Sequence, residues 1–95
     1  MSKLRRLARG MPCKVRLYGC DGGGQTTVLA HYPLAGYSGV AKKSPDVMGA
    51  WCCARCHDLV DGRVHLPNLT KQDVRLAHAE GVMRTIVELQ KQGEL

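Results

Sequence analysis

Cysteine spacing constrains this chain more than any other feature of its sequence. Cys53 and Cys56 form a Cys-x-x-Cys motif, the spacing of one half of a tetrahedral zinc site. Cys13 and Cys20 form a second, wider pair, and a strand and a glycine turn between them would return the second thiolate to the metal. Four thiolates satisfy zinc and leave no open coordination position. The sequence therefore predicts a structural four-cysteine zinc site.

A metal staple suits a chain of this size. We expect a single domain over 1–95, with a modest core because the chain has no Phe and one Trp. The basic start at residues 1–6 does not resemble a secretory signal, so we expect a reducing cytoplasm, where paired cysteines favour metal binding over disulfides. No apolar run approaches the length of a membrane span.

Two other interpretations of the cysteines stay open. Cys53 and Cys56 could form a thioredoxin-like redox pair, although no parallel βαβ pattern precedes them, or they could be buried thiols without a ligand. Cys52 lies in an apolar segment, and we interpret it as a buried thiol outside the metal site.

Apolar residues at helical spacing predict three helices. A short basic helix is expected over 3–9 and a long one over 71–91, where Thr70 and Asp73 resemble a capping box. Another helix is expected from His57, directly after the Cys-x-x-Cys motif.

Alternating and β-branched residues predict three short strands. These cover 13–18, 25–32 and 47–52, with a glycine-rich turn at 19–24 and a long loop at 33–46. Together with the helices, they predict an α+β fold.

The net charge of +6 favours a polyanionic partner, although a solvated basic face is the alternative. Arginines dominate the start of the chain, another lies within the Cys-x-x-Cys motif, and one more follows it. Guanidinium groups can bind phosphate oxygens bidentately. We expect nucleic-acid contacts from Arg5, Arg6, Arg9, Arg55 and Arg63.

His57 and Asp61 form a second candidate metal site. Their spacing of four places both on one face of the predicted helix, where an imidazole and a carboxylate could bind a divalent cation. Asp58 lies about 100° around the helix and is less suited to share that ion. The alternative is that His57 caps the motif and Asp61 is solvated.

The wider pattern resembles the HNH nuclease motif. His31 ends a predicted strand, Asp46 lies in the loop that follows, and His57 directly follows the Cys-x-x-Cys motif. A closer resemblance, to small prophage-encoded nucleases of the YbcO type, runs through most of the first 65 residues. It is carried by residues 4–10, 13–16, 28–31, 45–46 and 53–58.

The resemblance implies a role for each matching residue. His31 would be the general base that activates a water, and Asp46 would orient that histidine or its loop. His57 would ligate a catalytic Mg, Mn or Zn ion, with Asp61 as a second ligand. Many HNH enzymes have an acidic ligand directly before the catalytic histidine; here Ala30 stands there, so Asp61 or, less well placed, Asp58 would replace it.

The resemblance also implies the architecture and the activity. We expect a small zinc-stapled ββα-metal (HNH-like) domain, with a basic N-terminal helix and a long C-terminal helix. Its expected function is metal-dependent endonuclease cleavage of DNA in phage or prophage DNA processing or recombination, in the cytoplasm of a bacterial host.

The rival hypothesis is a non-catalytic zinc-knuckle module that binds nucleic acid or a partner protein. The two hypotheses differ in whether His31, His57 and Asp61 converge. The apolar face of the last helix could pack on the domain or on a second copy, so a homodimer is an open alternative.

Overall fold

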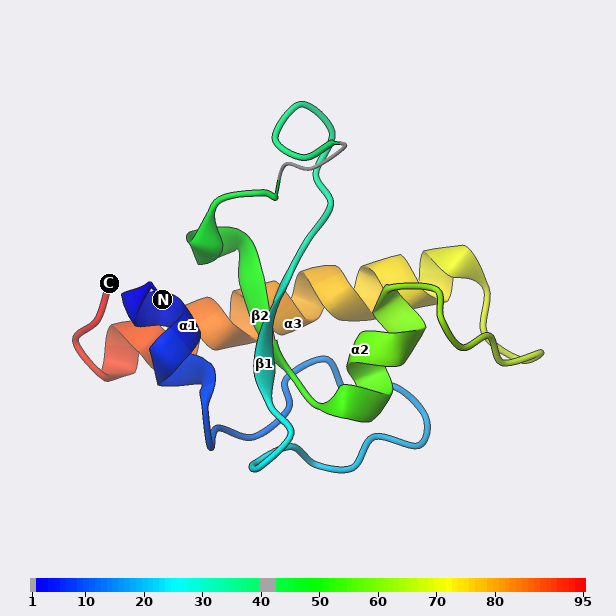
Figure 1. The fold of residues 1–95 in the computed structure, drawn as a ribbon, viewed down its shortest axis with the longest axis horizontal. Coiled ribbons are helices and arrows are strands. Elements are labelled where there is room, and N and C mark those ends of the chain that lie inside the picture. The colour runs from blue at the N-terminus through cyan, green and yellow to red at the C-terminus, as the bar shows by residue number, and fades with distance from the viewer. Residues whose placement is uncertain (1, 40–42) are drawn as a thin grey trace.

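A two-stranded antiparallel sheet lies against one long helix (Figure 1). The computed structural model describes residues 2–39 and 43–95. The elements are α1 (Lys3–Ala8), β1 (Val28–His31), η1 (Asp46–Met48, a 3-10 turn), β2 (Gly49–Cys52), α2 (Ala54–Val60) and α3 (Lys71–Lys91). In the sheet, Val28 pairs with Cys52 and His31 with Gly49. α1 and α2 lie on opposite sides of the strands, and α3 passes behind them (Figure 1).

The helix ends follow local side-chain chemistry. The capping box predicted for α3 is present: the Thr70 hydroxyl accepts from the Asp73 N–H (3.0 Å), and the Asp73 carboxylate accepts from the Thr70 N–H (2.9 Å). At α1, the Ser2 hydroxyl accepts from the Arg5 N–H (3.2 Å). In the described ranges, no helix has the length and apolar character needed to cross a membrane.

Residues 13–18 do not form the predicted strand. Arg16 has φ 60°, in the left-handed region, and this interrupts an extended backbone. The Lys14 N–H donates to the Trp51 carbonyl (2.8 Å), so the segment is tied to β2 by an isolated bond. Every second side chain is nevertheless buried: Cys13, Val15 and Leu17. The alternation therefore reflects burial of an irregular segment rather than a ladder.

The other two strands are shorter than predicted. Thr27 is held in a turn, because its N–H donates to the Gly24 carbonyl (3.2 Å) and its hydroxyl donates to the Met11 carbonyl (2.6 Å). β1 therefore begins at Val28, directly after this turn, and not at residue 25. η1 replaces the start of the predicted strand 47–52, and its Met48 N–H donates to the Pro45 carbonyl (2.9 Å). The predicted loop at 33–46 includes residues 40–42, which lie outside the described residues.

The helix predicted from His57 starts three residues earlier, at Ala54. The Cys53 sulfur accepts a hydrogen bond from the Cys56 N–H and so acts as the N-cap. Asp61 is the C-cap rather than a residue of the helix, but its φ of −83° and ψ of −6° continue the helical path. His57 and Asp61 therefore keep the one-turn relationship that the spacing predicts.

One of the two buried clusters joins α1, β2 and α3. It consists of Ala8, Trp51 and Leu89, each at most 2% exposed. The Thr85 hydroxyl adds a polar link, since it accepts from the Trp51 N–H (3.0 Å) and donates to the Gly81 carbonyl (2.8 Å). The C-terminal half of α3 is thus fixed to both the sheet and the N-terminal helix.

We expect Leu89→Ala to destabilise the protein by about 2–5 kcal/mol, because the truncated side chain leaves a cavity against Trp51 and Ala8. Val87→Ala on the same helix is the control, since Val87 is 48% exposed and its loss should change the free energy of unfolding by about 0.5 kcal/mol or less. Urea unfolding monitored by circular dichroism measures both. Equal losses would show that α3 is not packed in this orientation.

Candidate functional site

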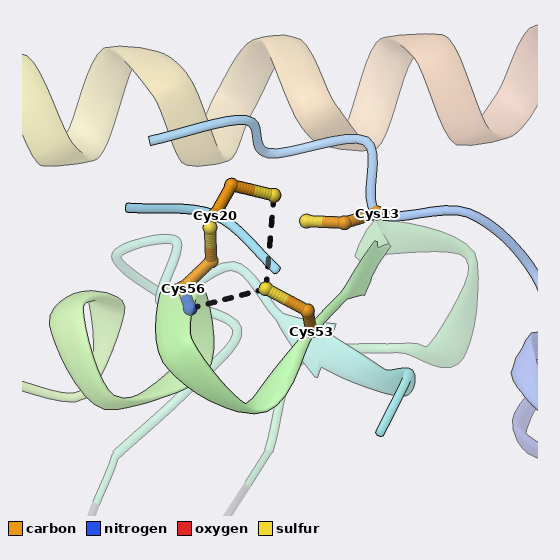
Figure 2. Close-up of side chains that lie close together, drawn as sticks. All are labelled: Cys13, Cys20, Cys53 and Cys56. Atoms are coloured by element: carbon orange, nitrogen blue, oxygen red, sulfur yellow. Dashed lines mark hydrogen bonds between the residues drawn. The ribbon is translucent and has the colours of Figure 1, made fainter. Parts of the chain in front are cut away.

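Four thiols from three separate segments meet beside the start of α2 (Figure 2). The Sγ atoms all lie within 4.8 Å of one another, and they belong to Cys13, Cys20, Cys53 and Cys56. The Sγ atoms of Cys20 and Cys53 are 3.7 Å apart. Within residues 2–39 and 43–95, this is the sole group of three or more candidate metal ligands at such close range. The structure thus brings together the two pairs recognised in the sequence.

Backbone N–H groups orient two of the sulfur atoms. The Gly22 N–H points to the Cys20 sulfur (3.4 Å), and the Cys56 N–H points to the Cys53 sulfur (3.4 Å; Figure 2). Gly23 allows the glycine-rich turn to approach the cluster, because with φ 83° a Cβ there would lie 2.5 Å from the Cys13 nitrogen. These backbone groups would hold the cysteine sulfur atoms in fixed orientations around a metal ion.

The pKa values of three of the four thiols are displaced in opposite directions. Hydrogen bonds from the Cys52 and Cys56 thiols hold the pKa of Cys13 well below its ordinary value. The hydrogen bond to Cys13, followed by burial, raises the pKa of Cys56, whereas burial is the main cause that raises the pKa of Cys20 to about 11. A tetrahedral cation such as zinc would replace these protons, so the donor set fits zinc and binding would release protons.

A cavity of about 630 Å³ collects the residues of the second constellation. His31 contributes from the end of β1, His57 from α2, and Asp61 from the cap that follows. Three cationic side chains share the lining: Arg5, Arg9 and Lys43. Three of the four residues predicted for the catalytic centre therefore border one space together with cationic side chains, whereas Asp46 is not among the lining residues.

His31 is paired with Asp46. Its Nε2 lies 2.6 Å from Asp46 Oδ1, which is also 3.6 Å from the Arg5 Nε. The hydrogen bonds from His31 and then Ser2, together with the charge of Arg5, lower the pKa of Asp46 against an opposing effect of burial. Because the carboxylate accepts from Nε2–H, the neutral imidazole of His31 has its free lone pair on Nδ1.

His57 and Asp61 form a second pair, with Nε2 and Oδ2 3.2 Å apart. Arg63 reaches the same Asp61 oxygen (Nη1, 3.0 Å) and also contacts Asp58 (Nε to Oδ1, 2.9 Å). Arg63 thus contacts both aspartates, and the contact that makes Asp61 the better placed carboxylate is its pairing with His57. In residues 2–39 and 43–95, the His31–Asp46 and His57–Asp61 pairs do not place three potential metal-ligand atoms as close together as the four cysteines are.

Ala30 lies in the core instead of the cavity wall. Its side chain is 3% exposed and belongs to the buried cluster that includes Cys13 and Val15. Since side chains alternate along a strand, the residue before His31 faces away from the side on which His31 lies. A carboxylate at position 30 would therefore point into the core.

The five arginines predicted to contact nucleic acid lie in different surroundings. Arg5 and Arg9 line the cavity, and Arg6 is exposed on α1. Arg55 lies beside the glycine turn, where a Cβ on Gly19 would be 3.2 Å from its Nε, and Arg63 is held by its two carboxylates.

His78 is a buried neighbour of the site to which sequence reasoning assigns no role. Its Nε2 lies 2.9 Å from the Ala30 carbonyl oxygen, and the residue is 4% exposed. Burial lowers its pKa. The signal available in the sequence was its place on the apolar face of the long helix, between Ala77 and Gly81, where a histidine must find a partner.

Comparison with known proteins identifies the family. The family model described as "Putative nuclease YbcO" matches residues 2–94. The chain belongs to the YbcO family. A YbcO protein of Escherichia coli (strain K12), named "Putative nuclease YbcO", is 39% identical over 94 residues, which cover 98% of this chain and 96% of that protein. The "Putative nuclease ybcO" of Enterobacteria phage 82 matches to the same extent.

A solved structure is also similar to this YbcO-family chain. It is described as a "putative bacteriophage protein from Escherichia coli str. K-12 substr. MG1655" and superposes with a TM-score of 0.78 at 34% identity. The match covers 96% of this chain and all of the other. The α+β fold with its two-stranded sheet and long C-terminal helix is therefore shared with a relative.

For the YbcO-family cysteine cluster, we expect about one zinc per chain. Cys56→Ala should lose the zinc and lower the melting temperature, because three thiolates leave the tetrahedral site open. Cys52→Ala is the matched control, since Cys52 is also fully buried but is not one of the four clustered thiols. Zinc content by atomic absorption and thermal melts with and without EDTA measure the effect; equal zinc in both variants would contradict the assignment.

We expect acid to destabilise the wild type through His78. The folded pKa of His78 lies below the unfolded value of about 6.5, so the unfolded chain binds the extra proton as pH falls. The contribution of His78 is complete above about pH 6.5 and is lost as pH drops toward the folded pKa. Urea unfolding of wild type and His78→Gln between pH 5 and pH 8 measures it. Parallel curves over that range would contradict a buried neutral imidazole.

Proposed function

We propose that this chain is an HNH-type (ββα-metal) endonuclease that hydrolyses phosphodiester bonds in DNA, in phage or prophage DNA processing or recombination in a bacterial host. The observation that carries the proposal is the cavity in which His31, His57 and Asp61 lie beside three cationic side chains. The order β1, β2, α2 agrees with a ββα arrangement. Shared family membership with proteins named as nucleases supports the same class of reaction.

His31 is the general base in this proposal. Its hydrogen bond to Asp46 fixes the ring and keeps the proton on Nε2, so Nδ1 accepts the proton of the attacking water. The negative charge of Asp46 stabilises the imidazolium that forms. This assigns Asp46 the orienting role.

His57 and Asp61 are the residues that would hold a divalent cation such as Mg, Mn or Zn. Their imidazole nitrogen and carboxylate oxygen are of the type that such ions accept, and they already lie 3.2 Å apart. When bound, the ion supplies stabilisation of the charge on the phosphate and on the leaving 3′ oxygen. A site of two protein ligands keeps coordination positions for water and substrate.

The cationic wall provides phosphate contacts. Arg5 and Arg9 from α1 and Lys43 from the loop line the same cavity as the histidines. Contacts of this kind bind any sequence and weaken steeply as salt rises, because counterions released from DNA drive the binding. The four cysteines, in turn, have a structural role: Cys56 directly precedes His57, so a zinc ion would hold α2 and orient His57 toward the cavity.

A non-catalytic zinc-knuckle module that binds nucleic acid or a partner protein is the second candidate. It is favoured by one observation: the two carboxylates assigned to the site are already paired, Asp46 with His31 and Asp61 with His57 and Arg63. Such a module would retain DNA after His31→Ala and would show no metal-dependent cleavage.

Plasmid nicking with added magnesium, manganese, zinc or nickel distinguishes the two. We expect cleavage by the wild type, and a loss of about 10²- to 10⁴-fold in His31→Ala because the general base is removed. His57→Ala should lose activity and require more metal.

The control for nicking is His65→Ala, because His65 is exposed and lines a different cavity, between α2 and α3. It should keep wild-type activity. Absence of cleavage by wild type with every metal, or full activity in both His31→Ala and His57→Ala, would refute the endonuclease and leave the binding module.

A further inference from the structure

We infer that His78 of α3 is a positioning residue for His31: it holds the strand end that carries the general base. The inference rests on the proposed function and deepens it, since it assigns to the site a residue from an element outside the ββα unit. The geometry that carries it is a contact between α3 and the residue on each side of His31, through the carbonyl of Ala30 and the ring of Tyr32.

The first contact is to the residue before His31. His78 Nε2 lies 2.9 Å from the Ala30 carbonyl oxygen, and a carbonyl can only accept, so His78 donates from Nε2–H. Only 4% of His78 is exposed, so water offers it little compensation if this bond is lost. The small buried side chain of Ala30 lets the imidazole of α3 come this close to the strand.

The second contact is to the residue after His31. The Tyr32 ring lies with its centroid 5.2 Å from that of His78, at an interplanar angle of 58°. The Arg75 guanidinium, one turn earlier on α3, lies 5.2 Å from the same Tyr32 centroid. Two side chains of α3 therefore hold residues 30 and 32, and His31 lies between them.

The strand needs this support because of where His31 lies. β1 has four residues in a two-stranded sheet, an arrangement that is weak by itself, and His31 is its last paired residue. The Asp46 partner of His31 belongs to η1, beyond a long loop.

The Tyr32 N–H donates to the Met48 carbonyl (3.0 Å) and the Tyr32 carbonyl accepts from the Ser44 hydroxyl, so the chain after His31 is held from the side of β2 and the loop. The Ala30 carbonyl before His31 is held from α3, and loss of that bond would let this peptide group turn and change the direction of the imidazole. A general base must be held to within a fraction of an ångström.

α3 also supplies a matched control. Thr85, two turns further along, also links the helix to the sheet, because its hydroxyl accepts a hydrogen bond from the Trp51 N–H in β2 (3.0 Å). Thr85 is as deeply buried as His78 but contacts the strand that does not carry His31. Thr85→Val removes that bond with little change of shape.

The test compares three variants of the zinc-loaded full chain. In plasmid cleavage, His78→Phe should lower kcat by about 10- to 100-fold with KM within about 2-fold, because the base is misplaced while phosphate contacts remain. His78→Gln should recover most of the rate, since its amide nitrogen can occupy the Nε2 position and donate. Thr85→Val should stay within about 3-fold of wild type after correction for stability. Equal losses in His78→Phe and Thr85→Val, or no recovery in His78→Gln, would overturn the inference.

A readout that needs no cleavage keeps this test separate from that of the nuclease itself. In ¹H–¹⁵N spectra of the wild-type imidazoles at pH 7, His78 should be the neutral tautomer with its proton on Nε2. The ring signals of His31 should shift or broaden in His78→Phe and stay unchanged in Thr85→Val. A His78 proton on Nδ1, or His31 signals insensitive to His78→Phe, would overturn the inference even if cleavage is found. If cleavage is absent but the His31 signals respond, the positioning contact stands and the nuclease proposal alone fails.

Discussion

Four sulfur atoms within 4.8 Å of one another are the constraint on which the structure depends. As thiolates they would repel strongly, and as thiols they can satisfy one another only in part; a tetrahedral cation removes both problems. The cluster ties the irregular segment after α1, the glycine turn and the start of α2 into one unit. A 95-residue chain without phenylalanine has limited means to hold such segments by apolar packing alone. A metal held by this cluster would replace part of a core.

The position of α2 is the link between this cluster and the cavity. Cys53 caps the helix, Cys56 lies in its first turn, and His57 follows, so the same turn supplies sulfur to one site and imidazole to the other. α3 supports the opposite wall through His78 and the strand end at His31. The two histidines of the candidate active site are thus fixed by different means, one by thiols and one by a buried hydrogen bond. Each can be disturbed without direct change to the other.

The features that could be predicted from the sequence are those set by residues close together in the chain. The bounds of α3 follow from periodicity and a capping box within four residues, and the pairing of Cys53 with Cys56 follows from one turn of helix. The alternating burial of side chains at 13–18 was also predictable, but the strand predicted there is absent. An alternating pattern of apolar residues indicates which side chains are buried, and it does not indicate which N–H groups form a ladder. That His31, His57 and Asp61 would belong to one site was implied by resemblance rather than by spacing, and the structure places all three in the lining of one cavity. His78 was missed since its partner, the Ala30 carbonyl, is 48 residues away and has no side-chain signature.

The ion pair between Arg5 and Asp46 connects substrate binding to the orientation of His31. Arg5 lies 3.6 Å from the same carboxylate oxygen that holds the imidazole, and it also lines the cavity. A phosphate that enters the cavity would compete with Asp46 for the Arg5 guanidinium. If Arg5 turned toward the phosphate, the negative charge of Asp46 would be less neutralised and would act more strongly on His31. Phosphate entry would therefore strengthen the hydrogen bond between Asp46 and His31, without any movement of the fold.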